Sequence, residues 1–289
     1  MRASGDEELK IYGIFGSPLG HTVSPAIQNR AFDHYHLKSI YFAFERSNAQ
    51  FRSLMRHLKS LLLDGFNVTV PFKEIVLPYL DRLSPEARAI GAVNTVKREG
   101  RNWTGYNTDG AGFLAGLGRM RFNARGKTAV ILGAGGSARA VACALAQKRV
   151  RRLVFANRTE NRAKALVHRF QNLFPKVTWS SVALREPALI SVLSEADLLV
   201  NATQVGLKKT DSSLVSPRAF PGRRILVYDL IYRPRVTRLI QIARKKGHRT
   251  LNGEEMLLHQ GAKAFEIWTG RKAPVAEMRK ALYGAIAHP

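Results

Sequence analysis

A glycine-rich turn between an apolar strand and a helix constrains this sequence most. Residues 127–148 read KTAVILGAGGSARAVACALAQK, so the apolar run TAVIL enters a helical run directly through glycines. A strand, a glycine turn and a helix in this order form the context in which a βαβ unit binds a dinucleotide. Glycines let the backbone approach a pyrophosphate, and the helix N-terminus supplies amide donors and a positive dipole. The pattern predicts cofactor contacts from Gly133, Ala134, Gly135, Gly136, Ser137 and Ala138.

The segments that follow repeat the alternation of strand and helix. RLVFANRTENRAKALVHRF reads as a strand and then a helix, and further apolar strands are expected at ADLLVNAT (196–203) and RILVYDLIY (224–232). Helices are expected at about 187–195 and 236–246. Strands that alternate with helices predict a parallel, doubly wound sheet. We therefore expect a Rossmann-type dinucleotide-binding domain over residues 109–252.

The first hundred residues predict a second α/β domain. Strands are expected at 9–15, 39–45 and GFNVTV (65–70), and two short strands surround the turn REGRN. One helix is expected to begin with Ser24 as N-cap and Pro25 at its first position. The apolar spacing over 48–63 predicts another helix with one buried face. Two closing helices have no strands of their own and are expected to cover this domain, which then comprises residues 1–108 with 253–289.

The end of the second strand in the dinucleotide-binding domain indicates which dinucleotide fits. NAD-binding proteins place an acidic residue there for the ribose hydroxyl, whereas this chain has Asn157-Arg158-Thr159 and then Arg162. Arg158 and Arg162 are four apart at the start of a helix, so they can share a face and clamp a 2′-phosphate with planar donors. The ordinary alternative is that Thr159 caps the helix and both arginines are surface charge. The missing acid favours NADP over NAD.

The stretch FNVTVPFK, residues 66–73, raises the question of what its last residue does. Polar and apolar residues alternate from Asn67 to Val70, which predicts a strand half buried against a core. Pro71 has no amide donor and ends the ladder, so Lys73 lies just past a strand end. Ligands bind at that rim in α/β proteins, where a lysine can serve catalysis or bind substrate. A solvated lysine at the start of a surface helix is the ordinary alternative.

The net charge calls for an explanation of its own. The 289 residues include 46 Lys and Arg against 21 Asp and Glu, which gives +25. Such an excess favours phosphates and nucleic acids. The charge is nevertheless dispersed in short clusters, KRVRR (148–152), GRR (222–224) and RKKGHR (244–249), without a basic tail or a nucleic-acid-binding motif beside them. We interpret it as a basic surface on an enzyme, with non-specific nucleic-acid affinity at low salt.

Other features of the sequence limit the class of protein to which the chain can belong. No apolar run is long enough to span a bilayer, and the first ten residues, MRASGDEELK, lack the apolar stretch of a signal peptide. The single cysteine, Cys143, allows no internal disulfide or multi-cysteine metal site. We expect a cytoplasmic monomer or homodimer that uses no metal and has no membrane partner.

Several polar clusters fall at expected strand or helix ends, where pocket residues belong. They read GHTVSP (20–25), FNVTVPFK (66–73), GAVNT (91–95), NTDG (107–110) and MLLHQGA (256–262). In that order, followed by GAGGSARA, NRT, NAT and YDLIY, they resemble the shikimate dehydrogenase family. The likeness extends from about residue 11 to 270, and several motifs in a fixed order are more specific than any one of them.

The resemblance implies an oxidoreductase that interconverts 3-dehydroshikimate and shikimate with NADP, on the route to aromatic amino acids. Lys73 matches the family's catalytic lysine, and Asp109 in NTDG matches its partner. A carbonyl that receives hydride develops negative charge on oxygen, which a nearby ammonium can stabilise and protonate. The resemblance thus favours the catalytic role for Lys73 over the solvated one.

The same resemblance assigns the remaining pocket residues. Thr22 and Ser24 match two hydroxyls that hold the substrate carboxylate; Asn67, Thr69, Asn94 and Gln260 match residues around the ring hydroxyls; Tyr232 matches a tyrosine near the carboxylate; and Thr203, Gly253 and Met256 match cofactor contacts. Each has an ordinary alternative when taken singly. Ser24 can cap a helix, Asn67 and Asn94 can fix turns, and Gln260 can lie on a helix surface.

Some positions depart from the family pattern. Thr22 stands where serine is commoner, and its methyl narrows that corner of the pocket, which bears on the choice between shikimate and quinate. Gln28 replaces a usual histidine at an expected structural position. Glu254 and Glu255 stand where small residues are general, beside the expected nicotinamide. Two rival hypotheses remain: an NAD-dependent quinate/shikimate dehydrogenase, and a basic nucleic-acid-binding protein on a dehydrogenase fold.

Overall fold

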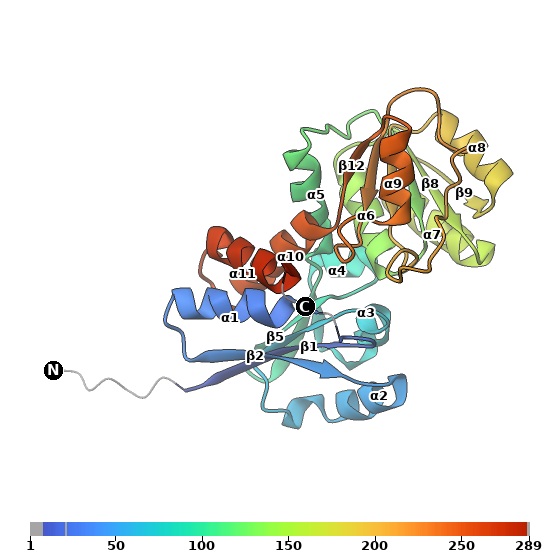
Figure 1. The fold of residues 1–289 in the computed structure, drawn as a ribbon. Helices are drawn as coiled ribbons and strands as arrows, with labels where there is room; N and C mark the ends of the chain where they lie inside the picture. Colours follow the sequence, from blue (N-terminus) through green and yellow to red (C-terminus); the bar gives the residue numbers. More distant parts are fainter. Residues whose placement is uncertain (1–7, 21, 288–289) are drawn as a thin grey trace. The chain divides into compact units, whose positions relative to one another are not determined.

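The chain forms two compact units in a computed structural model that describes residues 8–20 and 22–287. The first unit comprises residues up to Thr108 together with the segment from Leu258, and the second comprises Asp109–Leu257 (Figure 1). The chain therefore re-enters the first unit at Leu258 rather than at residue 253. His21 of the GHTVSP cluster lies outside the described residues, and so do the first seven residues of MRASGDEELK.

The first unit is built on a mixed six-stranded sheet with the order β2-β1-β3-β5-β6-β4. Its strands are β1 (Lys10–Gly16), β2 (Ser39–Glu45), β3 (Gly65–Val68), β4 (Arg82–Leu83), β5 (Thr95–Glu99) and β6 (Asn102–Tyr106). β1 pairs with β2 and β3 in parallel, whereas β5 pairs antiparallel with both β3 and β6. The expected hairpin around REGRN is confirmed; the two-residue strand β4 was not predicted.

Helices cover both faces of this sheet. The helices of the unit are α1 (Ser24–His34), α2 (Asn48–Arg56), α3 (Phe72–Ile75), α4 (Pro85–Ile90), the part of α10 (Glu254–Thr269) from Leu258, and α11 (Val275–Ala287). On one face Tyr12 packs against Phe32 of α1 and Trp268 of α10, and α1 lies beside α11 (Figure 1). On the other, Phe51 of α2 stacks on Phe72 of α3 with ring centroids 4.0 Å apart. The prediction that the closing helices cover this unit is confirmed.

Three local predictions in the first unit are wrong. Ser24 is the first helical residue of α1, not its cap; Val23 occupies the N-cap position. The helix expected over 48–63 ends at Arg56, and a 3₁₀ turn, Leu58–Ser60, follows. β3 ends at Val68, two residues early, and Asn67 is buried, like its apolar neighbours. The alternating pattern at Asn67 therefore marks a buried polar contact rather than a solvent-facing side.

The second unit has a fully parallel six-stranded sheet with the order β12-β11-β10-β7-β8-β9. The strands are β7 (Thr128–Leu132), β8 (Arg152–Asn157), β9 (Thr178–Ala183), β10 (Leu198–Asn201), β11 (Leu226–Asp229) and β12 (Arg249–Leu251). The predicted doubly wound topology is confirmed. The edge strands β9 and β12 were not predicted; β9 carries few apolar residues, and β12 has only three residues.

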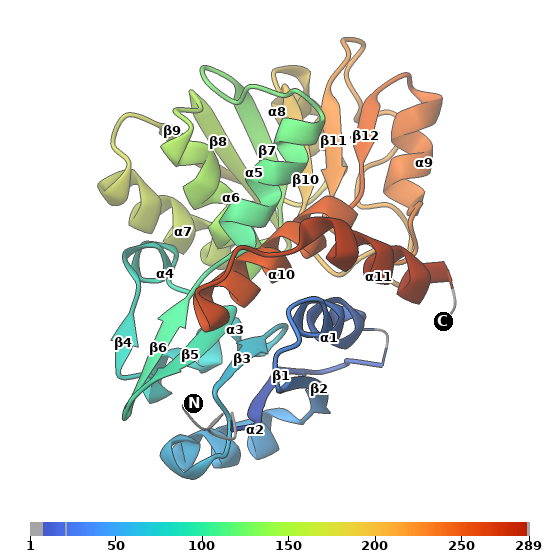
Figure 2. The ribbon, with the colours of Figure 1, turned by 90° about the vertical axis from the view of Figure 1, so that its left-hand side faces the viewer.

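Helices pack on both faces of the parallel sheet. They are α5 (Asp109–Arg119), α6 (Gly136–Gln147), α7 (Glu160–Leu173), α8 (Glu186–Ser194) and α9 (Arg238–Lys245). Leu189 of α8 and Leu239 of α9 join one apolar cluster with Val130 and Val227 of the sheet. On the other face Phe113 of α5 stacks on Tyr228, and Figure 2 shows α5 and α6 in front of the strands. Cys143 is buried within α6.

Two glycines of α5 provide a test of this packing. A Cβ at Gly116 would collide with the buried Tyr228 ring, whereas one at Gly118 would meet nothing within 4 Å. We expect Gly116→Ala to lower the free energy of unfolding by about 1–3 kcal/mol, because Tyr228 is held against Phe113 and has no room to move. Gly118→Ala should raise it by up to about 1 kcal/mol through helix propensity. Urea denaturation of both variants is the measurement, and equal shifts of the same sign would contradict the packing argument.

Candidate functional site

The predicted cofactor residues of the second unit follow the carboxyl ends of its strands. Gly133 comes directly after β7, Asn157 ends β8, Thr203 lies two residues after β10, and Gly253 lies two residues after β12. Because all six strands are parallel, these positions share one edge of the sheet, where doubly wound folds bind their ligands. Tyr232, predicted to contact substrate, follows β11 at the same edge, and burial raises the pKa of its hydroxyl.

The glycine turn has a backbone suited to a bound phosphate. Gly133 has φ of 107°, a conformation that side chains rarely adopt, and its N–H donates to Ala156 O at 2.9 Å. Gly135 is the N-cap of α6, and no side chain caps the helix there. The first N–H groups of a helix have no partner within the helix, and a Cβ built on Gly135 meets nothing within 4 Å. The start of α6 therefore combines helix amide donors with open space at Gly135, which fits the pyrophosphate of a dinucleotide.

The arginines after β8 are placed as an exposed pair. Arg158 and Arg162 are both exposed, and α7 begins between them. Thr159 occupies the N-cap position of α7 without a side-chain cap hydrogen bond, so the simple capping role considered for it is not what the structure shows. Asn157 Nδ2 donates to Thr159 O at 2.8 Å and fixes the turn that carries both arginines. These side chains can hold a 2′-phosphate, and no carboxylate ends β8.

A buried polar network orders the two loops at the centre of this edge. Asp229, at the end of β11, accepts hydrogen bonds from Asn201 Nδ2 (3.0 Å), Ile231 N (3.1 Å) and Thr237 Oγ1 (2.6 Å). Asn201, at the end of β10, accepts from Thr203 N and Oγ1 and donates to Val205 O. Burial raises the pKa of the Asp229 carboxyl, and these hydrogen bonds lower it in part. The network thereby fixes Thr203 and the chain leading to Tyr232.

The segment after β12 also approaches the loop after β11 closely. A Cβ at Gly253 would collide with Leu230 O, so the position requires glycine. Met256, predicted to contact cofactor, is buried in the first turn of α10. The unusual acids beside it are buried and paired: Glu254 with Arg235 at 2.5 Å, and Glu255 with Arg119 at 3.4 Å. Each pair ties the start of α10 to another segment of the second unit.

Predicted substrate residues of the first unit form a buried hydrogen-bonded cluster. Asn67 Nδ2 donates to Asn94 O and to Thr95 Oγ1, both at 2.9 Å. Asn94 Nδ2 donates to Thr108 Oγ1 at 2.9 Å and to Gln260 Oε1 at 3.3 Å, while Asn94 Oδ1 accepts from Thr108 N at 2.8 Å. Gln260 is therefore not a plain surface residue of α10. The cluster joins the ends of β3 and β6 to α10 within the first unit.

The other predicted residues of the first unit lie near strand and helix ends. Thr22 Oγ1 donates to Ser24 Oγ at 3.3 Å, so the two proposed carboxylate anchors are adjacent hydroxyls at the start of α1. Thr69 is half-buried directly after β3. Lys73 lies in α3 and is 9% exposed, which rules out the freely solvated lysine considered above. Asp109 is 4% exposed and begins α5, one residue after Thr108.

Comparisons with known proteins decide the family. Residues 14–96 match the model of the shikimate dehydrogenase substrate binding domain, 116–230 that of shikimate / quinate 5-dehydrogenase, and 253–283 that of the shikimate 5'-dehydrogenase C-terminal domain. The shikimate dehydrogenase (NADP(+)) of Geobacter metallireducens is 40% identical, with 96% of this chain and 98% of that protein covered. The chain belongs to the shikimate dehydrogenase family.

Solved structures of shikimate dehydrogenases share this fold. The enzyme of Thermus thermophilus, in complex with NADP(H) and shikimate, is 36% identical with a TM-score of 0.83, over 96% of this chain and 99% of that one. The quinate dehydrogenase of Corynebacterium glutamicum, in complex with NAD, is 31% identical with a TM-score of 0.85, over 95% and 99%. The similar structures thus include proteins that are named for different substrates and were solved with different dinucleotides.

Several polar residues of the shikimate dehydrogenase motifs escaped the prediction. Asn201 and Asp229 belong to NAT and YDLIY, while Thr95 and Thr108 belong to GAVNT and NTDG. A signal was present, because each of β10 and β11 is an apolar run that ends in one polar residue. Gln28, the other departure, donates from Nε2 to Gly261 O at 2.9 Å, in agreement with its expected structural role.

The Asn201 network leads to a prediction on stability and cofactor affinity. Asn201→Ala would remove one of the three hydrogen bonds of the buried Asp229, and it would remove the bonds that half-buried Thr203 and Val205 make to Asn201. We expect the free energy of unfolding to fall by about 2–3 kcal/mol. The dissociation constant for NADP⁺ should rise several-fold, because the Thr203 loop loses its anchor. Asn123→Ala is the matched control, because Asn123 is exposed and its Oδ1 accepts from Arg125 N of the same loop. Thermal unfolding and cofactor titration should separate the two variants.

Proposed function

We propose that this chain catalyses the reversible, NADPH-dependent reduction of 3-dehydroshikimate to shikimate in aromatic amino acid biosynthesis. The observation that carries the proposal is the 40% identity, over nearly the whole of both chains, to a protein named shikimate dehydrogenase (NADP(+)). The residues at the carboxyl edge of the second unit and the buried polar cluster of the first support it.

The proposed choice of NADP rests on the end of β8. Arg158 and Arg162 are exposed beside the fixed turn at Asn157, and the position that would hold an acid for an NAD ribose carries none. The rival hypothesis is NAD-dependent oxidation of quinate or shikimate. It is retained because the similar structures include a quinate dehydrogenase in complex with NAD. Planar arginine donors match a 2′-phosphate, whereas a free ribose hydroxyl offers them no charge to bind.

The proposed substrate contacts are polar groups that other residues hold in place. Asn67, Asn94 and Gln260 are fixed by mutual hydrogen bonds, so they can meet ring hydroxyls without first becoming ordered. Thr69, directly after β3, is proposed to join them. Thr22 and Ser24 supply two neutral donors for the carboxylate, and Tyr232 is proposed to lie near it. A site built from hydrogen-bonding groups rejects analogues that leave those groups unpaired.

Lys73 is the proposed proton donor and acceptor at the reacting oxygen, with Asp109 as its proposed partner. Bound NADPH would supply the hydride. When a carbonyl carbon accepts hydride, its oxygen gains an electron pair, which the Lys73 ammonium stabilises and protonates; in the reverse direction the lysine receives that proton. A buried lysine suits this role, because electrostatic interactions are stronger away from water.

The role of Lys73 is tested by its removal. Lys73→Ala should lower kcat with shikimate and NADP⁺ by at least about 100-fold, since proton transfer contributes about 10²–10⁴-fold. Binding of NADP⁺ should change little. Lys272→Ala, at an exposed position of the same unit, is the control. Nicotinamide absorbance with shikimate or quinate, each with NADP⁺ or NAD⁺, is the measurement. Wild-type protein inactive with all four pairs would overturn the function itself, whereas an active Lys73→Ala variant would overturn only the mechanism.

The nucleotide preference has a separate test. Arg158→Ala/Arg162→Ala should raise KM for NADP⁺ by about 10–100-fold, since each charge-assisted hydrogen bond contributes about 1.5 kcal/mol or more. KM for NAD⁺ should stay within about twofold. Lys164→Ala removes an exposed charge from the same helix and should alter neither. An equal loss with both dinucleotides would show that the two arginines do not recognise the 2′-phosphate.

The cytoplasmic location of the protein and its monomeric or dimeric state remain predictions.

A further inference from the structure

The basic clusters of the sequence meet at one edge of the second unit. The six segments that lead into its strands are residues 120–127, 148–152, 174–177, 195–197, 222–225 and 246–249. Their cations are Arg121, Arg125, Lys127, Lys148, Arg149, Arg151, Arg152, Lys176, Arg223, Arg224, Lys246 and Arg249, and their carboxylates are Glu195 and Asp197. Twelve of these 28 residues are basic, against 46 of 289 in the chain, so the charge is concentrated here. We call these six segments the amino edge.

The strand register places the cations side by side. Arg151 N donates to Lys127 O at 2.8 Å, and Gly126 N donates to Arg149 O at 3.0 Å, which joins the segments before β7 and β8. Arg249 N donates to Ile225 O at 3.1 Å and joins those before β11 and β12. Neighbouring strands lie about 4.8 Å apart, so six strands give a row about 24 Å long.

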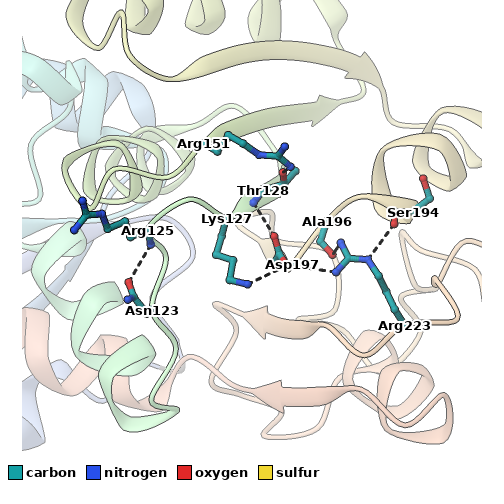
Figure 3. Close-up of polar contacts among 9 residues, drawn as sticks. All are labelled: Asn123, Arg125, Lys127, Thr128, Arg151, Ser194, Ala196, Asp197 and Arg223. Atoms are coloured by element: carbon teal, nitrogen blue, oxygen red, sulfur yellow. Dashed lines mark hydrogen bonds and ion pairs between the residues drawn. The ribbon is translucent and has the colours of Figure 1, made fainter.

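The two carboxylates both lie in the segment before β10, near the middle of the row. Asp197 accepts from Thr128 N at 2.9 Å and lies 3.3 Å from Arg223 Nη1 and 3.6 Å from Lys127 Nζ (Figure 3). Burial raises the pKa of Asp197, but Thr128 N–H and the two cations together hold it below its usual value. Glu195 pairs with Arg152 at 2.6 Å. These contacts account for three of the twelve cations.

Seven further cations of the row stand exposed. They are Arg121 and Arg125 before β7, Lys148 and Arg149 before β8, Lys176 before β9, Arg224 before β11 and Lys246 before β12. Among residues 8–20 and 22–287, none of these seven side chains has a carboxylate partner. Burial lowers the pKa of His248, and Lys246 and Arg224 lower it further, as expected in a positive field.

We propose that the amino edge is a docking surface for the phosphodiester backbone of a nucleic acid. A double helix carries one phosphate charge per about 1.7 Å of its axis and needs only a row of cations to bind without sequence preference. Eight of the twelve cations are arginines, whose planar donors match phosphate oxygens.

The absence of apolar anchors at the amino edge argues against an acidic protein or a membrane surface as its partner. Protein interfaces depend on buried aromatic or aliphatic anchors, and membrane-surface binding gains from apolar side chains that enter the lipid. In the described part of the chain, no large exposed apolar side chain lies within the six segments, and only Leu173 borders one. Charge without an apolar centre fits a phosphate backbone best.

This surface is separate from the proposed cofactor site. The glycine turn and Arg158 follow the carboxyl ends of the strands, whereas the amino edge precedes their other ends. Strands of four to six residues place the two edges about 13–20 Å apart. Nucleic acid bound at the amino edge therefore leaves the NADP site open, and the two ligands bind independently.

The test compares two fivefold variants of the full chain. The edge variant is Arg125→Gln, Lys148→Gln, Lys176→Gln, Arg224→Gln and Lys246→Gln; the matched control is Lys10→Gln, Arg52→Gln, Arg56→Gln, Arg101→Gln and Lys272→Gln, all exposed cations of the first unit. Fluorescence anisotropy measures the binding of a labelled DNA duplex of about 30 base pairs over a series of salt concentrations. Each phosphate contact contributes about −0.9 to the slope of log K against log salt.

We expect the edge variant to bind the duplex at least about 10-fold more weakly at low salt, with a slope shallower by about 3–4. The control should keep the wild-type slope, and saturating NADP⁺ should displace none of the duplex. Circular dichroism and nicotinamide turnover report whether the variants are folded. If the fivefold variant does not fold, Lys148→Gln/Lys176→Gln and Arg224→Gln/Lys246→Gln test the two sides of the row separately, each with a slope shallower by up to about 2.

Four outcomes would overturn the proposal. Equal weakening in the control would show that net charge alone binds the duplex. Displacement by NADP⁺ would place the duplex in the nucleotide site. Tighter binding to phosphatidylserine vesicles or to polyglutamate than to the duplex would assign the surface to a membrane or to an acidic protein. No binding of wild-type protein to the duplex at low salt would leave the amino edge without this ligand.

Discussion

The common direction of the six strands in the second unit is the constraint on which its chemistry depends. Parallel pairing brings every carboxyl end to one edge and every amino end to the other. Short loops after the strands can then place Gly133, Asn157 and Thr203 together, although they are up to seventy residues apart in sequence. The same pairing gathers cations from separate loops at the opposite edge. One hydrogen-bonding pattern thus creates two surfaces of different chemistry.

Buried polar residues at the strand ends give the carboxyl edge its fixed geometry. A strand end buried between helices leaves peptide groups that must find partners. Asn201 and Asp229 supply those partners from within the sheet, and both are almost completely buried. Burying such side chains costs free energy unless each polar atom is bonded. The network meets that condition and in return holds two loops in a single arrangement. Asn67 and Asn94 apply the same principle at the strand ends of the first unit.

Local sequence patterns predicted the architecture better than the element boundaries. The glycine turn, the parallel alternation and the REGRN hairpin follow from steric and hydrogen-bonding rules that act over a few residues, and all three are present. The pattern failed at Asn67, because alternation cannot distinguish a polar side chain facing solvent from one facing a polar cluster. Ser24 failed as a cap because the helix begins at Ser24 itself, with Val23 at the N-cap position. The error at Asn67 involves partners distant in sequence, Asn94 and Thr95, which local rules do not include.

The site shows the same division between local and distant information. The identity of Lys73 and its place after a strand can be read from eight residues, yet its burial depends on how the first unit packs. The distribution of the basic residues could not be read locally. Their clusters look dispersed along the chain, but they form a row once β7 pairs with β8 and β11 pairs with β12. An enzyme that needed only solubility could distribute +25 over its whole surface. At the amino edge, the proposed anionic partner would bind away from the proposed cofactor residues, whereas nucleic acid bound beside Arg158 would compete with the NADP phosphate for the same cations.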